Sequence, residues 1–144
     1  MASCRMVVSF VVLLCAVGVA VPAQEKEAEL SAKQLEVVAQ KTAKLSAAEK
    51  AIMKEWSPGK NAAEFICQDL ALKELGKTYK GADRVFMDKT EADPRPRLVT
   101  QSLLVGEGSV RHSGGWTDFS YECDLDPEKG TATAFRLTEA GGKK

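Results

Sequence analysis

The chain changes its hydrophobic period near its middle. Residues 25–56 contain no Gly or Pro, and their apolar side chains recur at spacings of three, four or seven, the period of one helix face. Residues 24–57 are therefore predicted to form an amphipathic helical arm. Ser46 and Glu49 fit a capping box, so we expect the arm to break near Leu45 and restart at Ser46. The predicted apolar face comprises Leu35, Val38, Leu45, Ile52 and Trp56.

A second, more apolar helix is predicted over residues 62–75. Ser57-Pro58-Gly59 is a stop signal that ends the arm. Asn61 is the expected N-cap, with Glu64 three residues on, and Gly76 is the expected first residue beyond the helix. The pattern indicates a core helix. Its apolar face comprises Ala63, Ile66, Cys67, Leu70 and Ala71.

After Gly76 the pattern changes to the alternation of β-strands. Gly106 and Gly108 are expected to mark a bulge, and Gly114-Gly115 a hairpin turn. An acidic turn is expected at 126–130. Strands are predicted at 84–87, 98–106, 116–125 and 131–137, with a loop at 89–97.

The strands have one apolar and one polar face, which suits an antiparallel sheet covered on one side. In the third predicted strand the inward residues are Thr117, Phe119, Tyr121, Cys123 and Leu125. In the fourth they are Thr133, Phe135 and Leu137. The predicted fold class is therefore α+β, with one core helix packed on a three- to four-stranded antiparallel β-meander. This domain is assigned to residues 58–139, and 140–144 are expected to form a disordered tail.

Residues 1–23 have the order of a secretory signal peptide. One basic residue, Arg5, precedes an apolar run at 6–21, and cleavage is expected after Ala23. The mature chain would then be periplasmic or extracellular. Two alternatives remain open. One is an uncleaved anchor, although a spanning helix needs roughly 20 apolar residues. The other is a lipid-modified Cys15.

Removal of the leader leaves two cysteines, Cys67 and Cys123. An even pair in an exported chain predicts one disulfide, here between the core helix and the sheet. On the chain-entropy account, closing a loop of this length stabilises the fold by roughly 4 kcal/mol. Two free buried thiols, or a redox-active pair, are the alternatives. A redox pair would lack a nearby thiol to resolve a mixed disulfide.

Charge gives no reason to expect nucleic acid or an anionic membrane as a partner. The chain has 20 basic and 20 acidic residues, and of these only Arg5 lies in the leader. The mature net charge is therefore about −1.

No catalytic constellation stands out. His112, the only histidine, is expected to be an exposed turn residue, with a general base or metal ligand as the alternative. Together with Trp116 and Asp118 it marks a possible exposed binding face. The mature chain has fewer than the four Cys or His ligands of a structural zinc site. We predict no catalytic, cofactor-binding or metal-binding residue, and no cofactor. Three alternating acids lack the closing Glu of a calcium loop and are expected to form only a turn: Asp124, Asp126 and Glu128.

Around the cysteine pair, the sequence resembles a known family. The motifs are Cys67-Gln-Asp-Leu-Ala71, Asp83-Arg84-Val85, Gly106-Glu-Gly108, Gly115-Trp116, Phe119-Ser-Tyr121-Glu-Cys123, Asp126-Pro127 and Phe135. Over about residues 62–137 the chain resembles a group of short, exported bacterial domains of unknown function, found mostly in alphaproteobacteria. The resemblance implies a periplasmic, disulfide-held α+β domain and brings no catalytic residue or ligand.

Two functional hypotheses follow. The first is a non-enzymatic envelope or secreted module that binds a partner protein, or a copy of itself, through residues 24–57. Fold-back of this arm onto the domain is the alternative role for it. The second hypothesis is a small-ligand binder or hydrolase that uses the exposed sheet face near His112 and Trp116.

Overall fold

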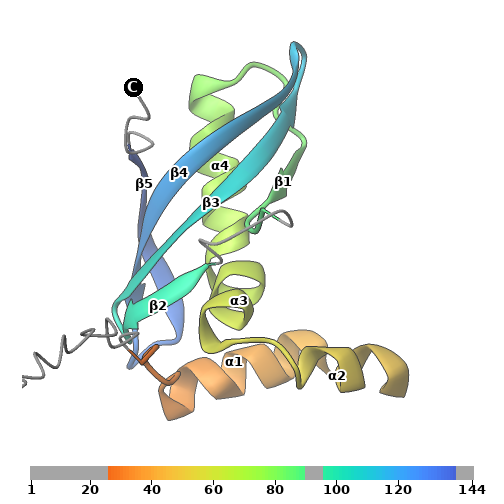
Figure 1. The fold of residues 1–144 in the computed structure, drawn as a ribbon, viewed down its shortest axis with the longest axis vertical. Helices are drawn as coiled ribbons and strands as arrows, with labels where there is room; N and C mark the ends of the chain where they lie inside the picture. The colour runs from red at the N-terminus through yellow and green to blue at the C-terminus, as the bar shows by residue number, and fades with distance from the viewer. Residues whose placement is uncertain (1–25, 90–95, 139–144) are drawn as a thin grey trace, which may run out of the picture.

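The structure, a computed structural model, describes residues 26–89 and 96–138. The predicted signal peptide, the predicted tail and most of the 89–97 loop lie outside these residues. The described chain forms two layers, a five-stranded antiparallel sheet and a long helix across one of its faces (Figure 1). The α+β class is confirmed, with one more strand than expected.

One continuous helical run makes the second layer. It comprises α3 (Pro58–Ala62), the π-helical turn η1 (Ala63–Cys67) and α4 (Gln68–Thr78). The prediction that Asn61 caps this helix is wrong. Ser57 is the N-cap, because its hydroxyl accepts a hydrogen bond from the Lys60 N–H and Pro58 suits the first turn.

The helix also ends later than predicted. Gly76 lies inside α4, and the first glycine with positive φ after this helix is Gly81, at 76°. The predicted apolar face is confirmed, except that Leu70 is only half-buried. The buried residues of the run include Ala63, Ile66, Cys67, Ala71 and Leu75.

In the sheet, β3 holds the central position (Figure 1). It pairs along its length with β4, while β1 and β2 share its other edge and β5 pairs with the far side of β4. The predicted hairpin at Gly114–Gly115 and the turn at 126–130 both form. The strands are β1 (Arg84–Phe86), β2 (Arg97–Thr100), β3 (Leu103–His112), β4 (Gly115–Asp126) and β5 (Thr131–Thr138).

The single strand predicted at 98–106 is wrong, because the chain reverses at Gln101 and Ser102 to give β2 and β3. This turn contains no Gly, Pro or Asn, so its sequence signal is weak. The Ser102 N–H donates locally to the Thr100 hydroxyl at 3.2 Å, and two long-range contacts also hold the turn. The Gln34 amide donates to the Gln101 carbonyl at 2.8 Å, and the Leu125 N–H donates to the Ser102 carbonyl at 2.9 Å.

The bulge predicted at Gly106 and Gly108 is also wrong, since β3 pairs with β4 in unbroken register through both glycines. Gly106 lies opposite Tyr121, and Gly108 lies opposite Phe119. Register shifts occur elsewhere: in β5, where Asp124 pairs with residue 134 and Leu125 with residue 132, and in β2, between residues 98 and 100.

Thr133 is therefore the extra residue of a bulge in β5. The prediction that its side chain faces inward is wrong. Thr133 is exposed, whereas Phe135 is buried. Leu137 pairs with the inward-facing Tyr121 but remains 42% exposed, because it lies at the open edge of the sheet.

The predicted break in the arm is confirmed. Helix α1 (Ala32–Thr42) begins with a capping box at Ser31, and helix α2 (Ala47–Met53) begins with a capping box at Ser46. Helix α1 packs on the domain through Gln34 and Thr42, and Leu30, just before the helix, is also buried. The predicted apolar face of the arm is only partly packed. Val38 packs against the core, whereas Leu35 and Ile52 are 54% and 61% exposed.

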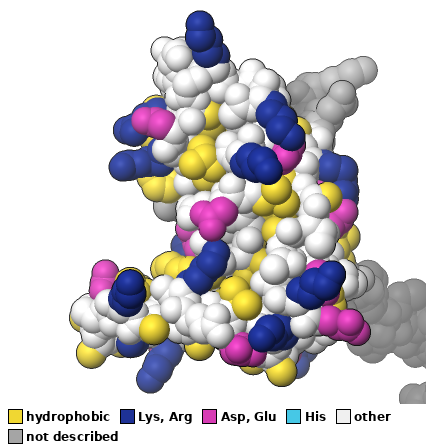
Figure 2. All heavy atoms as spheres, turned by 180° about the vertical axis from the view of Figure 1, so that it is seen from behind, with side chains coloured by type: hydrophobic (Ala, Val, Ile, Leu, Met, Phe, Trp, Pro, Cys, Tyr) yellow, Lys and Arg dark blue, Asp and Glu magenta, His cyan; other side chains and the backbone are white. Residues whose placement is uncertain are grey.

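The two halves of the arm therefore differ. Near α1, the Glu27 carboxylate accepts hydrogen bonds from the N–H groups of Gly59 and Leu98, and the Ser31 hydroxyl donates to the Pro127 carbonyl. Helix α2 has no buried residue. It projects from the body of the molecule, and the surface is hollowed beside it (Figure 2).

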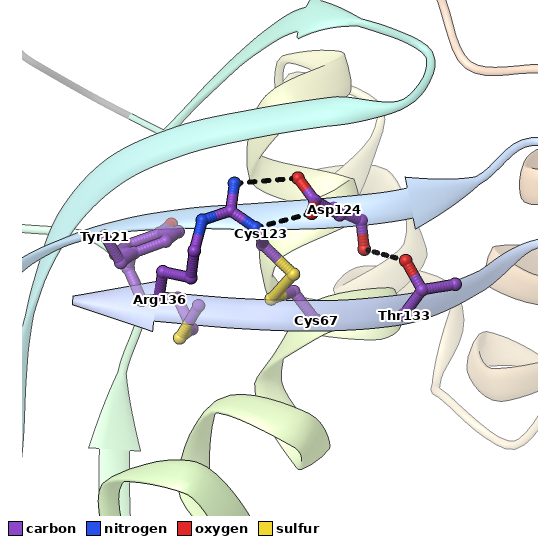
Figure 3. The surroundings of a disulfide bond; sticks show 7 residues. Cys67, Tyr121, Cys123, Asp124, Thr133 and Arg136 are labelled. Atoms are coloured by element: carbon purple, nitrogen blue, oxygen red, sulfur yellow. Dashed lines mark hydrogen bonds and ion pairs between the residues drawn. A yellow bond between two sulfur atoms is a disulfide. The ribbon is translucent and has the colours of Figure 1, made fainter. Parts of the chain in front are cut away.

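The predicted disulfide is confirmed. Cys67 in η1 and Cys123 in β4 are joined, with Cα atoms 6.5 Å apart, a usual separation for a disulfide (Figure 3). Both residues are fully buried. The bond links the helical layer to the sheet at the centre of the core.

Candidate functional site

The outer face of the sheet, away from the helix, carries the most distinctive group of side chains. Residues directly opposite on neighbouring strands share a face. One row across β1, β3 and β4 is Arg84, Arg111 and Trp116, and the next is Phe86, Ser109 and Asp118. We call these two rows, with Asp83 and Lys89, the aromatic patch.

Two stacked rings form the centre of the aromatic patch. Phe86 and Trp116 lie with ring centroids 5.3 Å apart and planes 11° from parallel. They come from strands on either side of β3, so the pair bridges that strand. Each residue is 50% exposed. A large apolar pair is therefore available to a binding partner among charged and polar neighbours.

Charged side chains around the rings are held in pairs. The Arg111 guanidinium donates two hydrogen bonds to the Asp83 carboxylate, at 2.8 and 2.7 Å, and this contact lowers the pKa of Asp83. Asp118 accepts a hydrogen bond from Ser109 and lies 2.9 Å from the Lys89 ammonium. These two contacts, with Ser109 the larger cause, lower the pKa of Asp118. The rim of the patch is thus charged on both sides and already ordered.

Of the three residues predicted to share an exposed face, the structure brings together only Trp116 and Asp118. His112 is turned to the helix side, where its ring lies 5.1 Å from that of Tyr79. Its Nδ1 accepts a hydrogen bond from the Gly114 N–H, which leaves Nε2–H to donate to the Thr117 hydroxyl at 2.8 Å. Both nitrogens of His112 are occupied, and neither meets the aromatic patch.

The sequence prediction missed Phe86 and Arg111. A signal for Phe86 was present, since Val85 and Met87 are apolar neighbours that both turn inward. Alternation then places Phe86 outward. Arg111 could not be assigned in the same way, because its position beside Trp116 depends on the register between β3 and β4.

A second polar cluster joins the core helix to the segment after β1. Lys60 Nζ lies 2.6 Å from the Asp88 carboxylate and 4.8 Å from the centre of the Trp56 ring. The Gln68 amide donates to the Glu64 carboxylate at 3.0 Å. Burial raises the pKa of Glu64, the nearby Lys60 opposes this rise, and Asp88 adds to it.

This polar cluster was also missed, because Glu64 was interpreted as a capping residue. The signal for it is the spacing of Lys60, Glu64 and Gln68 four residues apart along one helix face. The cluster lies beside the π-helical turn η1, a kind of irregularity found often at functional sites. Its polar atoms bond mainly to one another, so it ties two elements together and leaves few groups for a ligand.

No group of three or more His, Cys, Asp or Glu side chains among the described residues is arranged to hold a metal ion. Of the three alternating acids, Asp126 and Glu128 lie at the predicted turn, whereas Asp124 is a paired residue of β4. Asp126 accepts hydrogen bonds from the N–H groups of Glu128 and Lys129, and Asp124 binds Arg136. Within the same ranges, no helix has the length and apolar character needed to cross a bilayer.

Comparison with curated proteins and with solved structures found no match to this chain. Comparison with family models gave a match over residues 53–141, which spans most of the chain and includes the core helix, the disulfide and the aromatic patch. The matching description is "Domain of Unknown Function (DUF930)". The chain therefore belongs to this family, DUF930, whose region of similarity begins at the end of the projecting helix and runs through the whole sheet.

Proposed function

We propose that this chain is an exported, non-enzymatic module that binds a protein partner through the aromatic patch. The observation that carries the proposal is the exposed, stacked pair Phe86 and Trp116 inside a rim of ordered charges. A buried disulfide suits a chain that works in an oxidising compartment, as the leader predicts and as the resembling alphaproteobacterial domains imply.

The chemistry of the patch favours a protein as the ligand. Aromatic residues and arginine are enriched at protein interfaces, and tryptophan and arginine dominate their energetic hot spots. Phe86 and Trp116 are already stacked, and Arg111 is already fixed by Asp83. Binding would therefore cost little side-chain entropy. The rim carries both signs of charge, which supports selection among partners by charge pattern.

The alternative of a small-ligand binder or hydrolase has little support in this geometry. It relied on His112, Trp116 and Asp118 forming one site. His112 faces the opposite side of the sheet and has both nitrogens hydrogen-bonded. A general base must reach the group it deprotonates, and His112 does not reach the patch.

The arm retains a smaller role in the proposal. Helix α1 is packed on the domain, and deleting residues 24–57 would remove Leu30 and Gln34 from the core. Only the projecting helix α2, with the exposed Ile52, is free to add a second contact. Ile52→Glu tests that contact without disturbing the core.

The binding test is an affinity pull-down from the native envelope fraction with the full chain as bait. The patch variant is Phe86→Ala with Trp116→Ala, and the control is Leu35→Ala, another half-exposed apolar residue on a different surface. We expect the wild type and the control to retain one partner that the patch variant loses by about tenfold or more. A partner retained by the folded patch variant, or no partner above the empty-matrix background, contradicts the proposal.

Export is tested separately by N-terminal sequencing of the chain recovered from the envelope fraction. We expect the first residue to be Gln24. A chain that stays in the cytoplasm with residues 1–23 attached contradicts export but leaves the binding test unaffected.

A further inference from the structure

One stretch of β4 has a strand neighbour on only one side. β5 ends at Thr138 and pairs with β4 from Ser120 to Asp126, whereas residues 115–119 of β4 pair with β3 alone. The β3–β4 hairpin therefore extends past the end of β5 (Figure 1). We call residues 115–119 the open end of β4. On its free side, no strand of the described chain lies within pairing reach.

The open end presents the backbone groups of two residues of the aromatic patch, Trp116 and Asp118. Successive residues of a strand turn their N–H and C=O groups to opposite sides. The Asp124 carbonyl accepts a hydrogen bond from the Thr133 hydroxyl, so Asp124 faces β5. Trp116 and Asp118 have the same parity as Asp124, and β4 pairs with β3 in unbroken register between them. Their N–H and C=O groups therefore face the free side, where no described residue bonds to them.

Side chains on both faces of the open end suit an added strand. On the outer face, Trp116 is 50% exposed and the Asp118 side chain is 62% exposed. Lys89 approaches Asp118 from the β1 side, which leaves the other side of this carboxylate accessible. On the inner face, an open cavity of about 170 Å³ is lined by Glu74, Leu75, Thr78, Phe135 and Leu137. An added strand in line with β5 would place its next inward side chain beside this cavity, opposite Phe119.

We infer that the protein partner binds the open end of β4 as an added antiparallel strand. The inference rests on the proposed function, since Trp116 and Asp118 belong to both surfaces. Backbone groups of the added strand pair with those of Trp116 and Asp118. Its outward side chains are an apolar one opposite Trp116 and a basic one opposite Asp118, because cross-strand apolar and opposite-charge pairs stabilise a sheet. Its inward side chain opposite Phe119 is apolar and borders the cavity.

Two other occupants match these surfaces less well. If the chain itself continued beyond Thr138 in the register of β5, Glu139 would lie opposite Phe119 and a glycine would lie opposite Trp116. Such a segment supplies no apolar side chain for the cavity or for the indole, and glycine is a poor strand former. The same edge of a second copy, paired across a twofold axis, would set Asp118 opposite an aspartate or a tryptophan. Neither arrangement gives this carboxylate a cation.

A synthetic probe tests the backbone pairing while its side chains stay constant. The probe is the blocked peptide Thr-Val-Lys-Thr-Phe-Thr, whose Val, Lys and Phe would lie opposite Phe119, Asp118 and Trp116. Methyl groups on the Lys and Phe nitrogens remove the N–H groups that would face β4. A methyl group on the nitrogen of the Thr between them removes an N–H group that would face solvent. This second peptide is the matched control.

Titration calorimetry of the full chain measures the three affinities. We expect the unmethylated and control peptides to bind similarly, and the doubly methylated peptide to bind at least about tenfold more weakly. Asp118→Lys should weaken binding of the unmethylated peptide, whereas Leu35→Lys, on an exposed leucine of α1, should not. Equal affinities for the three peptides, or no binding up to roughly millimolar peptide, overturn the inference. Neither result affects the pull-down, which tests the proposed function by itself.

Amide hydrogen exchange of the wild type gives a second readout that needs no variant. In the free chain we expect the N–H groups of Trp116 and Asp118 to exchange rapidly and to gain protection when the unmethylated peptide is added. The N–H group of Thr117, which faces β3, should be unaffected. Protection already present in the free chain and lost on deletion of residues 139–144 would place the chain's own end on this edge. Protection that rises with protein concentration would place a second copy there. Either result overturns the inference.

Discussion

At the scale of single residues, the close approach of neighbouring atoms explains why glycine occupies positions 106 and 108. Backbone conformation does not explain it. Neither has a positive φ. A Cβ on Gly106 would lie 2.7 Å from the Tyr121 hydroxyl, and a Cβ on Gly108 would lie within van der Waals overlap of the Phe86 carbonyl and the Phe119 ring. The two glycines leave room for the rings of Tyr121 and Phe119, their partners on β4, to lie against β3. Such packing of an aromatic ring over a glycine on the neighbouring strand is a known way to stabilise a sheet.

This role predicts opposite results for two glycine-to-alanine changes. Gly108→Ala should lower the free energy of unfolding by about 1–3 kcal/mol, because the added methyl group meets rigid backbone and a buried ring. Gly76→Ala, inside α4 with nothing within 4 Å, should raise it by about 0.5–1 kcal/mol through helix propensity. Urea unfolding of both variants measures the difference. Stability that rises equally in both would show that Gly108 is not sterically required.

At the scale of elements, α1 and α2 begin with the same capping box but contribute differently to the fold. Ser31 accepts from the Gln34 N–H and also donates to the Pro127 carbonyl at 2.7 Å. The Ser46 hydroxyl makes hydrogen bonds only with Glu49. Because α2 buries no residue, its unfolding need not be coupled to that of the sheet.

Removing the Ser31 and Ser46 hydroxyl groups in turn should therefore distinguish the stability of the whole fold from the local stability of α2. Ser31→Ala should lower the free energy of global unfolding by about 1–2 kcal/mol, since a cap and a tertiary hydrogen bond are both lost. Ser46→Ala should change it by less than about 0.5 kcal/mol, while amide exchange in α2 becomes faster. Urea unfolding and hydrogen exchange measure the two effects. A large global loss in Ser46→Ala would mean that α2 packs on another surface.

At the scale of the whole molecule, local signals predicted the fold class, the disulfide and most strands, and failed where distant contacts decide. The turn at Gln101 is held in part by Gln34, far away in sequence, whose amide donates to the Gln101 carbonyl. Leu35 was assigned to the apolar face of the arm, but it is exposed, whereas the polar Gln34 is buried against the domain and its amide donates to the Gln101 carbonyl. The outward position of Trp116 followed from alternation, whereas its contact with Phe86 depends on a register that the sequence does not specify.

The disulfide is the strongest constraint at this scale, because Cys67 and Cys123 join the two layers across 56 residues of sequence. Both are fully buried, so a thiol reductant should not reach the bond in the native protein. In urea, where the chain opens, the bond should be reduced. The unfolding transition should then shift by the equivalent of about 4 kcal/mol, the loop-closure entropy of the cross-link.

Reduced wild type is the right comparison for this measurement, because it keeps both sulfur atoms and leaves no cavity, whereas Cys→Ala substitutions would add a packing loss. A domain of this kind is stable by only about 5–15 kcal/mol. The reduced chain should therefore unfold at a much lower urea concentration, or already be unfolded without urea. If the reduced and oxidised forms unfold within about 1 kcal/mol of each other, the unfolded chain must already hold the helix near the sheet. The layers would then be joined chiefly by the apolar contacts around Tyr121 and Leu75.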